Sequence, residues 1–277
     1  MIKVGLAGIG FMGWMHWLAY QRVEGIEVVA IASSDPQKRS GDWRGIKGNF
    51  GPPGEVVDLQ GITTVENYDE LLSIDEIDVI DICLPPAAHP ALALQTAAAT
   101  KHVFCEKPLA LNVADAQKMV DSCRKANVTL SVGHVLPFFP EYKWAREQID
   151  SGKYGALLGG TFKRVISNPE WIPDFYKLDK VGGPLVDLHV HDAHLIRFLF
   201  GLPTKVFSVG RMNGEAVEYA SSSFVFDSKD LVVSSVMGWC SNKGDRLPMV
   251  LRYTWKRQPS ISSLLAFKTP ARRCLSN

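Results

Sequence analysis

The chain has 277 residues, of which 46% are hydrophobic and 21% are charged, and its formal net charge is +1. This length suits two domains with a sizeable core, and the composition excludes a disordered or fibrous protein. The near-neutral charge and the lack of a bilayer-length apolar stretch give no reason to expect nucleic acid or membrane as a partner, while five cysteines without paired spacing favour reduced thiols in the cytoplasm.

The first half of the chain alternates short apolar runs with helical segments. The apolar runs predict buried strands at residues 2–7, 27–33, 79–84, 102–105 and 128–135. Helices are predicted at residues 14–23, 87–100 and 113–126, a helix start at 35–39, and a loop followed by a short helix at 65–72. Strands that alternate with helices of this length predict a doubly wound parallel sheet, here as a first domain over residues 1–134.

The pattern changes in the second half, where we predict a second α/β domain over residues 135–241. Helices are predicted at residues 141–151 and 184–200, and strands at residues 157–166, 205–210, 221–226 and 231–237. The last three strands follow one another directly and should be antiparallel. The sheet of this domain should therefore be covered by helices on one face.

A glycine motif lies between the first strand and the first helix. Gly8 permits a tight turn, Gly10 leaves room for a pyrophosphate, and Gly13 lets the helix pack against the strand. The phosphates would then lie at the helix N-terminus. The motif predicts an NAD or NADP site, which should also include Phe11 and Met12 from the same turn.

The end of the second strand bears on the choice between NAD and NADP. An acidic residue that binds the ribose 2′-hydroxyl of NAD is usual there, but this chain has Ser33 and Ser34, with Lys38 and Arg39 shortly after. Hydroxyls and nearby cations suit a 2′-phosphate, so the sequence slightly favours NADP. The alternative is that Asp35 binds the ribose while the two cations form a solvated helix face.

The triplet Glu106-Lys107-Pro108 follows the strand predicted at residues 102–105. Ligands bind beyond the carboxyl edge of open α/β sheets, so Lys107 should face the bound cofactor. The neighbouring strand ends at the same edge. The remaining cofactor-binding residues expected there are Leu84, Pro85, His89 and Glu106, and His16 is a further residue that could line the nicotinamide pocket.

A second group of reactive side chains lies in the helix predicted at residues 184–200. Asp187 and His191 are four residues apart, with His194 three residues beyond, so all three share one face. Alcohol oxidation needs a base, and histidine titrates near neutral pH. A metal site is the alternative for these residues, but no fourth ligand follows at a metal spacing. His189 lies off this face and should be structural, and Trp171 is a candidate substrate contact.

The glycine motif, Glu106-Lys107-Pro108, and Gly182-Gly183 leading into Asp187-x-x-x-His191-x-x-His194 resemble the glucose-fructose oxidoreductase/inositol dehydrogenase (Gfo/Idh/MocA) family over roughly residues 1–241. The resemblance implies a Rossmann domain followed by an α/β domain with a large open sheet. It implies hydride transfer between NAD(P) and a carbon of a sugar, cyclitol or related polyol. It also implies that Lys107 hydrogen-bonds the reacting oxygen, that His191 is the acid/base, and that Asp187 orients this pair.

The tail, residues 242–277, departs from the family pattern. After Trp239 there are eight Lys/Arg residues and one acid, and we expect no regular strand alternation there. One hypothesis is a reading-frame shift between Asn242 and Arg246, because a neighbouring frame can encode an alternating, strand-like sequence. A homo-oligomer formed through the second sheet is expected if that sheet is complete.

Two other functions stay open at this stage. The first is a cofactor-binding protein without turnover, either regulatory or inactivated by the tail. The second is a dehydrogenase of a small amino-acid-like substrate, which the sequence favours less because no arginine clamp for a carboxylate is evident.

Overall fold

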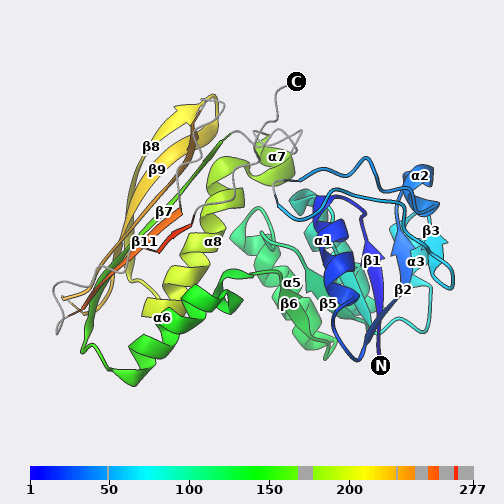
Figure 1. Ribbon diagram of the computed structural model, residues 1–277, viewed down its shortest axis with the longest axis horizontal. Coiled ribbons are helices and arrows are strands. Elements are labelled where there is room, and N and C mark those ends of the chain that lie inside the picture. Colours follow the sequence, from blue (N-terminus) through cyan, green and yellow to red (C-terminus); the bar gives the residue numbers. More distant parts are fainter. Residues whose placement is uncertain (49, 168–176, 229, 241–248, 256–264, 268–277) are drawn as a thin grey trace. The chain divides into compact units, whose positions relative to one another are not determined.

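The computed structural model describes residues 1–277 except residues 49, 168–176, 229, 241–248, 256–264 and 268–277. The described chain forms two compact units, one built mainly from Met1–Gly133 and the other mainly from His134 onward. Each unit has its own six-stranded sheet (Figure 1). Within the described ranges, none of the helices combines the length and the hydropathy that a membrane span requires.

The sheet of the first unit is entirely parallel, with strand order β3-β2-β1-β4-β5-β6. Its strands are β1 (Ile2–Ala7), β2 (Ile26–Ala32), β3 (Thr63–Val65), β4 (Val79–Ile82), β5 (His102–Cys105) and β6 (Leu130–Val132). This order confirms the predicted doubly wound fold. Strand β3 was not among the predicted strands, because three residues with two exposed threonines carry no recognisable period.

Helices cover both faces of this sheet. They are α1 (Phe11–Tyr20), α2 (Pro36–Arg39), α3 (Tyr68–Leu72), η1 (Pro86–Ala88), α4 (His89–Ala98) and α5 (Val113–Lys125). On one face, Trp14 and Trp17 of α1 pack edge-on against Trp43, with ring centroids 5.8 and 5.1 Å apart. On the other face, α3, α4 and α5 bury an aliphatic core that includes Leu71 and Met119. The carboxyl edge of the sheet stays available for a ligand.

The second unit has a mixed sheet with strand order β12-β11-β7-β10-β9-β8. Its strands are β7 (Leu157–Ser167), β8 (Lys205–Asn213), β9 (Ala216–Val225), β10 (Val232–Cys240), β11 (Met249–Trp255) and β12 (Leu265–Phe267). Only β7 and β10 pair in parallel among these described strands, and the other neighbours are antiparallel. The sheet is therefore mostly antiparallel, as expected.

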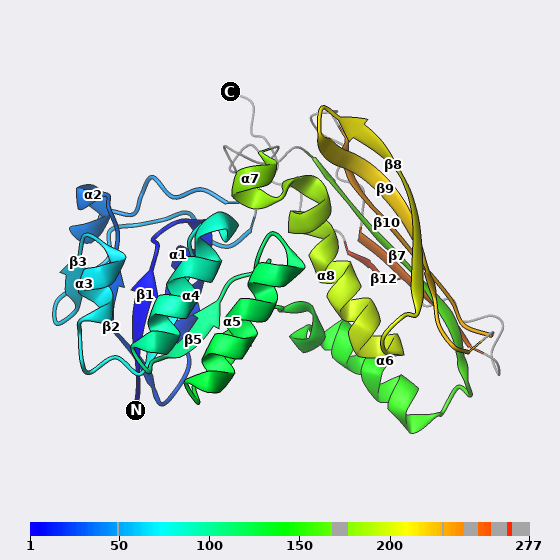
Figure 2. The ribbon, with the colours of Figure 1, turned by 180° about the vertical axis from the view of Figure 1, so that it is seen from behind.

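The helices of this unit lie along one face of its sheet in both views (Figures 1 and 2). They include α6 (Pro140–Ser151), α8 (Gly183–Phe200) and the short segment η2 (Leu136–Phe138). The short helix α7 (Leu178–Val181) precedes α8 in sequence, and its residues Asp179–Val181 group with the first unit. Leu195 and Ile196 of α8 pack with Tyr142 of α6 and with Phe162 and Phe224 of the sheet. This contact fixes which face of α8 is turned away from the sheet.

Strands β11 and β12 come from the segment in which we predicted no further alternation, and that expectation is wrong for residues 249–255. β11 pairs with β7 over Val250 to Trp255. Tyr253 is buried, whereas Arg252 and Thr254 are exposed. The alternation of these three residues was the available signal, and it was obscured by the basic composition of the whole tail.

Candidate functional site

Two of the three glycines in the motif, Gly8 and Gly13, leave no room for a side chain. Gly8 has φ +97°, and a Cβ there would lie 2.8 Å from the carbonyl oxygen of Cys83. A Cβ on Gly13 would lie 2.1 Å from the carbonyl oxygen of Gly8, so α1 packs directly on the turn. Gly10, by contrast, has open space where a Cβ would stand, and it caps α1 without a side-chain hydrogen bond. The free helix N-terminus and the open space fit a pyrophosphate.

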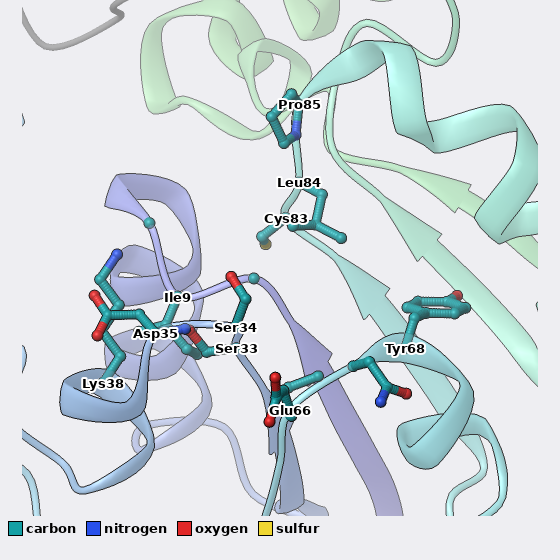
Figure 3. A pocket seen from close by; sticks show the side chains of 14 residues that line it. Ile9, Ser33, Ser34, Asp35, Lys38, Glu66, Tyr68, Cys83, Leu84 and Pro85 are labelled. Atoms are coloured by element: carbon teal, nitrogen blue, oxygen red, sulfur yellow. The ribbon is translucent and has the colours of Figure 1, made fainter.

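A cavity of about 430 Å³ adjoins this turn at the carboxyl edge of the sheet (Figure 3). It brings together predicted residues from the ends of three strands. Its lining residues are Gly8, Ile9, Gly10, Ala32, Ser33, Ser34, Asp35, Lys38, Glu66, Asn67, Tyr68, Cys83, Leu84 and Pro85. The sequence did not point to Glu66, Asn67 or Tyr68, because they follow the unpredicted strand β3.

The end of β2 presents a polar surface to this cavity. The carboxylate of Asp35 accepts the backbone N–H of Gln37 at 2.9 Å and so caps α2. Arg39 donates from Nη1 to the carbonyl oxygen of Ser33 at 2.7 Å, and its Nη2 lies 3.6 Å from Glu66. Lys38 lines the cavity. Asp35 is therefore engaged as a helix cap, and Arg39 in holding the strand end.

The Glu106-Lys107-Pro108 turn is held by its backbone and by one carboxylate. The backbone N–H of Glu106 donates to Ile82 of the neighbouring strand at 3.0 Å. The carboxylate of Glu106 is buried, and its Oε2 accepts the backbone N–H of Lys107 at 3.0 Å. Lys107 itself is half-buried just beyond the strand end. This backbone anchoring fixes the point from which the lysine side chain leaves the sheet.

His89 does not line the cavity; it is fully buried beneath the strand ends. Its Nδ1 lies 2.9 Å from the carbonyl oxygen of Pro108, and its Nε2 lies 2.8 Å from that of Leu84. Burial lowers the pKa of His89, so the ring is neutral and donates to one of the two carbonyls. The residue ties the turn to the end of β4, and this structural position differs from the expected cofactor contact.

Two other predicted residues take different positions. Phe11 packs edge-on against Phe50, with ring centroids 4.8 Å apart, and Met12 is half-buried in the first turn of α1; neither is among the cavity-lining residues. Trp171 lies outside the described residues.

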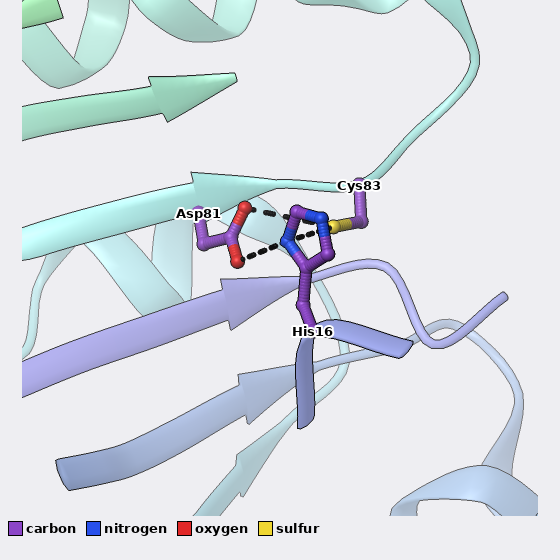
Figure 4. A group of neighbouring side chains, drawn as sticks. All are labelled: His16, Asp81 and Cys83. Carbon is purple, nitrogen blue, oxygen red and sulfur yellow. Dashed lines mark hydrogen bonds and ion pairs between the residues drawn. The ribbon is translucent and has the colours of Figure 1, made fainter. Parts of the chain in front are cut away.

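His16, Asp81 and Cys83 form a polar cluster inside the first unit (Figure 4). His16 Nδ1 lies 2.8 Å from Asp81 Oδ2 and 3.3 Å from Cys83 Sγ, and the phenol of Tyr20 donates to the same Asp81 oxygen at 2.8 Å. Their donor atoms lie within 4.8 Å of one another, a grouping that could hold a metal ion. The 2.8 Å contacts of Asp81 with His16 and Tyr20 are direct hydrogen bonds, so these side chains satisfy one another's hydrogen-bonding groups. The signal that sequence reasoning missed was an acid inside the apolar strand β4.

The second group of predicted residues lies on α8 as expected. Asp187, His191 and His194 are half-buried on one face of the helix, away from the residues that pack on the sheet. The ring of His194 stacks on that of His134 at 4.0 Å, nearly parallel. His189 points elsewhere, with its Nδ1 3.4 Å from the Ser235 hydroxyl. Burial lowers the pKa of both His189 and His194.

A buried ion pair fixes α8 on its sheet. Arg164 of β7 donates from Nε and Nη2 to the two carboxylate oxygens of Asp192, at 3.0 and 2.9 Å. Both side chains are almost fully buried. Because Asp192 follows His191 directly, this bidentate contact sets the rotation of the helix that carries the predicted acid/base.

Two family models together match most of the chain. Residues 2–134 match the GFO_IDH_MocA model, described as an oxidoreductase family with an NAD-binding Rossmann fold. Residues 142–254 match the GFO/IDH/MocA C-terminal domain, a match that includes β11. Both units therefore carry sequence features of one family.

Two curated relatives with a named activity are similar to this chain. The chain is similar to 2,7-anhydro-N-acetylneuraminate hydratase of Escherichia coli (strain K12), with 31% identity over 76% of this chain and 53% of the relative. It is similar to myo-inositol 2-dehydrogenase of Thermotoga maritima, with 32% identity over 48% of this chain and 39% of the relative. The chain thus spans about half the length, or less, of these curated relatives.

Solved structures share the fold. The WlbA dehydrogenase from Bordetella pertussis, in complex with NADH and UDP-GlcNAcA, superposes with a TM-score of 0.78 at 19% identity. The match covers 92% of this chain and 71% of that one. At this identity the likeness concerns the fold alone.

Proposed function

Because the chain belongs to the GFO/IDH/MocA oxidoreductase family, we propose that it transfers a hydride between NAD(P) and a carbinol carbon of a sugar, cyclitol or related polyol. The observation that carries this proposal is the turn at Gly8, Gly10 and Gly13. Its open space and free helix N-terminus adjoin a cavity at the carboxyl edge of the sheet. A dinucleotide is the ligand that this arrangement suits best.

The substrate class follows from the named relatives. One is a dehydrogenase of myo-inositol, one is a hydratase of an anhydro-sugar acid, and one structural neighbour holds a nucleotide sugar. All three names describe polyhydroxylated rings. A ring with several secondary hydroxyls is therefore the class to test first.

We assign the catalytic roles to Lys107, His191 and Asp187. The bound nicotinamide would supply the hydride acceptor or donor. Lys107 would hydrogen-bond the reacting oxygen, supported by the backbone anchoring of its turn through Glu106. His191 would take or return the hydroxyl proton. Asp187, one helical turn earlier on α8, would orient Lys107 and His191. His194, on the same helix face, and Trp171 would contact the substrate.

The end of β2 supports a preference for NADP. Ser34 and Lys38 line the cavity, and the carboxylate of Asp35 is used to cap α2. A 2′-phosphate would therefore meet a hydroxyl and an ammonium group. Glu66 also lines the cavity, but Arg39 lies 3.6 Å away and offsets its charge. Replacing Lys38 with alanine should weaken NADPH binding more than NADH binding; equal weakening of both would contradict the preference.

The test of the function combines binding with turnover. Fluorescence titration with NADH and NADPH measures cofactor binding, and a panel of sugars and polyols followed at the nicotinamide absorbance measures turnover. The Lys107→Ala variant should bind the cofactor normally and lose turnover. Lys118→Ala, an exposed lysine on α5, is the matched control and should change neither.

The other outcomes of this test are distinct. Cofactor binding without turnover on any substrate would favour a regulatory or inactive cofactor-binding protein. Loss of an anhydro-sugar with no net change in nicotinamide absorbance would favour hydration, the reaction named for the Escherichia coli relative. Failure to bind either cofactor would contradict all of these functions.

A homo-oligomer formed through the second sheet is also part of the proposal. All residues of the edge strand β8 are exposed, including Val206, Phe207, Val209 and Met212. An exposed apolar edge strand is a surface that another chain can cover. Light scattering after size exclusion should give more than one subunit, and Val209→Lys should lower the mass; a monomeric native protein would contradict the proposal.

The cysteines of the first unit support the predicted reducing, cytoplasmic compartment. Cys83, Cys105 and Cys123 are free, and the last two are buried. Burial raises the pKa of each of the three thiols, so they are poor nucleophiles and resist oxidation.

A further inference from the structure

Three side chains form a continuous hydrogen-bonded chain across the first unit. Asp81 Oδ2 lies 2.8 Å from His16 Nδ1, and His16 Nε2 lies 3.0 Å from Glu106 Oε1. Asp81 lies on β4, His16 on α1 and Glu106 in the turn after β5. In sequence, His16 is 65 residues from Asp81 and 90 residues from Glu106. Asp81 and Glu106 are buried, and the His16 side chain is only 12% exposed. We call this group the Asp81–His16–Glu106 chain.

The proton count of this chain follows from its geometry. Each ring nitrogen of His16 faces a carboxylate oxygen, so each contact needs one proton. Whether both protons belong to the imidazole or one belongs to a carboxyl group, the three groups together carry a charge of −1. Burial alone would lower the pKa of His16, but its hydrogen bonds with Asp81, Cys83 and Glu106 outweigh burial and raise it. Both contacts therefore persist as hydrogen bonds through neutral pH.

Glu106 connects this chain to Lys107. Its Oε1 receives His16, and its Oε2 accepts the backbone N–H of Lys107 at 3.0 Å. Space around the carboxylate is restricted, because a Cβ on Gly133 would lie 2.7 Å from Oε1. The ring of His16 also stacks on Phe104 at 5.3 Å. The carboxylate is thus held on one side by α1 and on the other by the backbone of the lysine turn.

His16 is not among the residues that line the cavity, and its two ring nitrogens are already occupied. It therefore acts through Glu106 and not by touching a ligand. The phenol of Tyr20 and the thiol of Cys83 also face Asp81, at 2.8 and 3.5 Å. These contacts fix Asp81, the far end of the chain, and so make the whole chain rigid.

We propose that His16 and Asp81 are positioning residues that hold the Glu106 carboxylate, and through it the Lys107 backbone, in the orientation needed for hydride transfer. The catalytic part of this statement rests on the proposed function; the structural part does not. The chain links α1, whose N-terminus forms the glycine turn, to the turn that carries Lys107. His16 then couples the cofactor helix to the proposed catalytic lysine.

Two matched substitutions at His16 separate its hydrogen bond with Asp81 from its hydrogen bond with Glu106. The amide nitrogen of asparagine takes the place of Nδ1, and that of glutamine takes the place of Nε2. His16→Asn should therefore keep the donor to Asp81 and lose the one to Glu106, whereas His16→Gln should do the reverse. His102→Gln is the control, because His102 lies at the exposed start of β5, where its Nδ1 accepts the backbone N–H of Thr129 at 3.0 Å.

Amide hydrogen exchange, resolved to single residues, reads the positioning directly and needs no substrate. The Lys107 amide depends on the Glu106 carboxylate, whereas the Glu106 amide donates to the Ile82 carbonyl and serves as an internal reference. In His16→Asn, exchange at Lys107 should rise about tenfold relative to that reference. In His16→Gln and in the His102 control it should stay near the native rate. Unchanged exchange at Lys107 in His16→Asn, or an equal rise at both amides in both His16 variants, would overturn the proposal.

Kinetics then test the catalytic consequence. With a substrate found in the panel, His16→Asn should lower kcat about tenfold or more with little change in the KM for the cofactor, and His16→Gln should restore most of the loss. Asp81→Asn should fall between the two. Equal kcat values in His16→Asn and His16→Gln would refute a role of His16 in catalysis. If the native protein turns over no substrate, the proposed function fails, and the exchange measurement alone decides whether the chain positions Lys107. Chelation with EDTA should leave both readouts unchanged, and a loss would replace the proposal with a metal site.

Discussion

Replacing Asp192 with asparagine should cost the second unit more stability than any exposed charge substitution. The Arg164–Asp192 pair is bidentate, at 3.0 and 2.9 Å, and its side chains are 10% and 5% exposed. The isosteric amide removes the carboxylate charge that faces the buried guanidinium. Breaking one side of such a pair costs roughly 3–5 kcal/mol, and we expect about 3 kcal/mol because the amide oxygen can still accept one hydrogen bond.

Urea unfolding followed by circular dichroism measures this loss, and NADH identifies the transitions. A ligand bound to the first unit raises only that unit's transition, so the other transition reports the second unit. Asp150→Asn is the matched control, because Asp150 pairs with Arg146 at 2.8 Å on the exposed side of α6 and should cost at most about 0.5 kcal/mol. The double variant Arg164→Met/Asp192→Leu should recover most of the stability.

Equal losses in Asp192→Asn and Asp150→Asn would refute the reasoning, because the buried charge would then carry no special cost. A large loss in the double variant would also contradict it, since the penalty would belong to packing and not to an unpaired charge.

Two further predictions concern the glycine turn and acid stability. In Gly13→Ala, the new Cβ would lie 2.1 Å from the Gly8 carbonyl oxygen, so the turn must move and NADH affinity should fall about tenfold or more; an unaltered Kd in fluorescence titration would rule out the close packing. Burial lowers the pKa of His89, His189 and His194, which take up protons on unfolding, so these three histidines should make the free energy of unfolding fall as the pH drops below about 6.5. His189→Gln should flatten this slope in urea titrations between pH 5 and pH 7, and an identical slope would show that His189 is not among the groups responsible.

Local features of the sequence were sufficient for the parts of the fold that depend on neighbouring residues. The helix start predicted at residues 35–39 is confirmed, with Asp35 as the N-cap of α2, because the cap contact spans two residues. Asp187 and His191 share a helix face because their spacing matches one turn. Strand β3 was missed because three residues are too few to show a period. For the tail, the reading-frame hypothesis stays a prediction that sequencing the gene tests, although β11 occupies part of that segment.

The sequence by itself determined the alternating strands and helices of the first unit, the glycine turn, and the place of Lys107 at a strand end. These features arise from steric and periodic rules that act over a few residues. Only the tertiary structure decided that His16 meets Asp81 and Glu106, that His89 is buried under the turn, and that β11 joins the sheet beside β7. Such partners are tens of residues apart, and which of them meet depends on strand order and helix placement, which no local pattern contains.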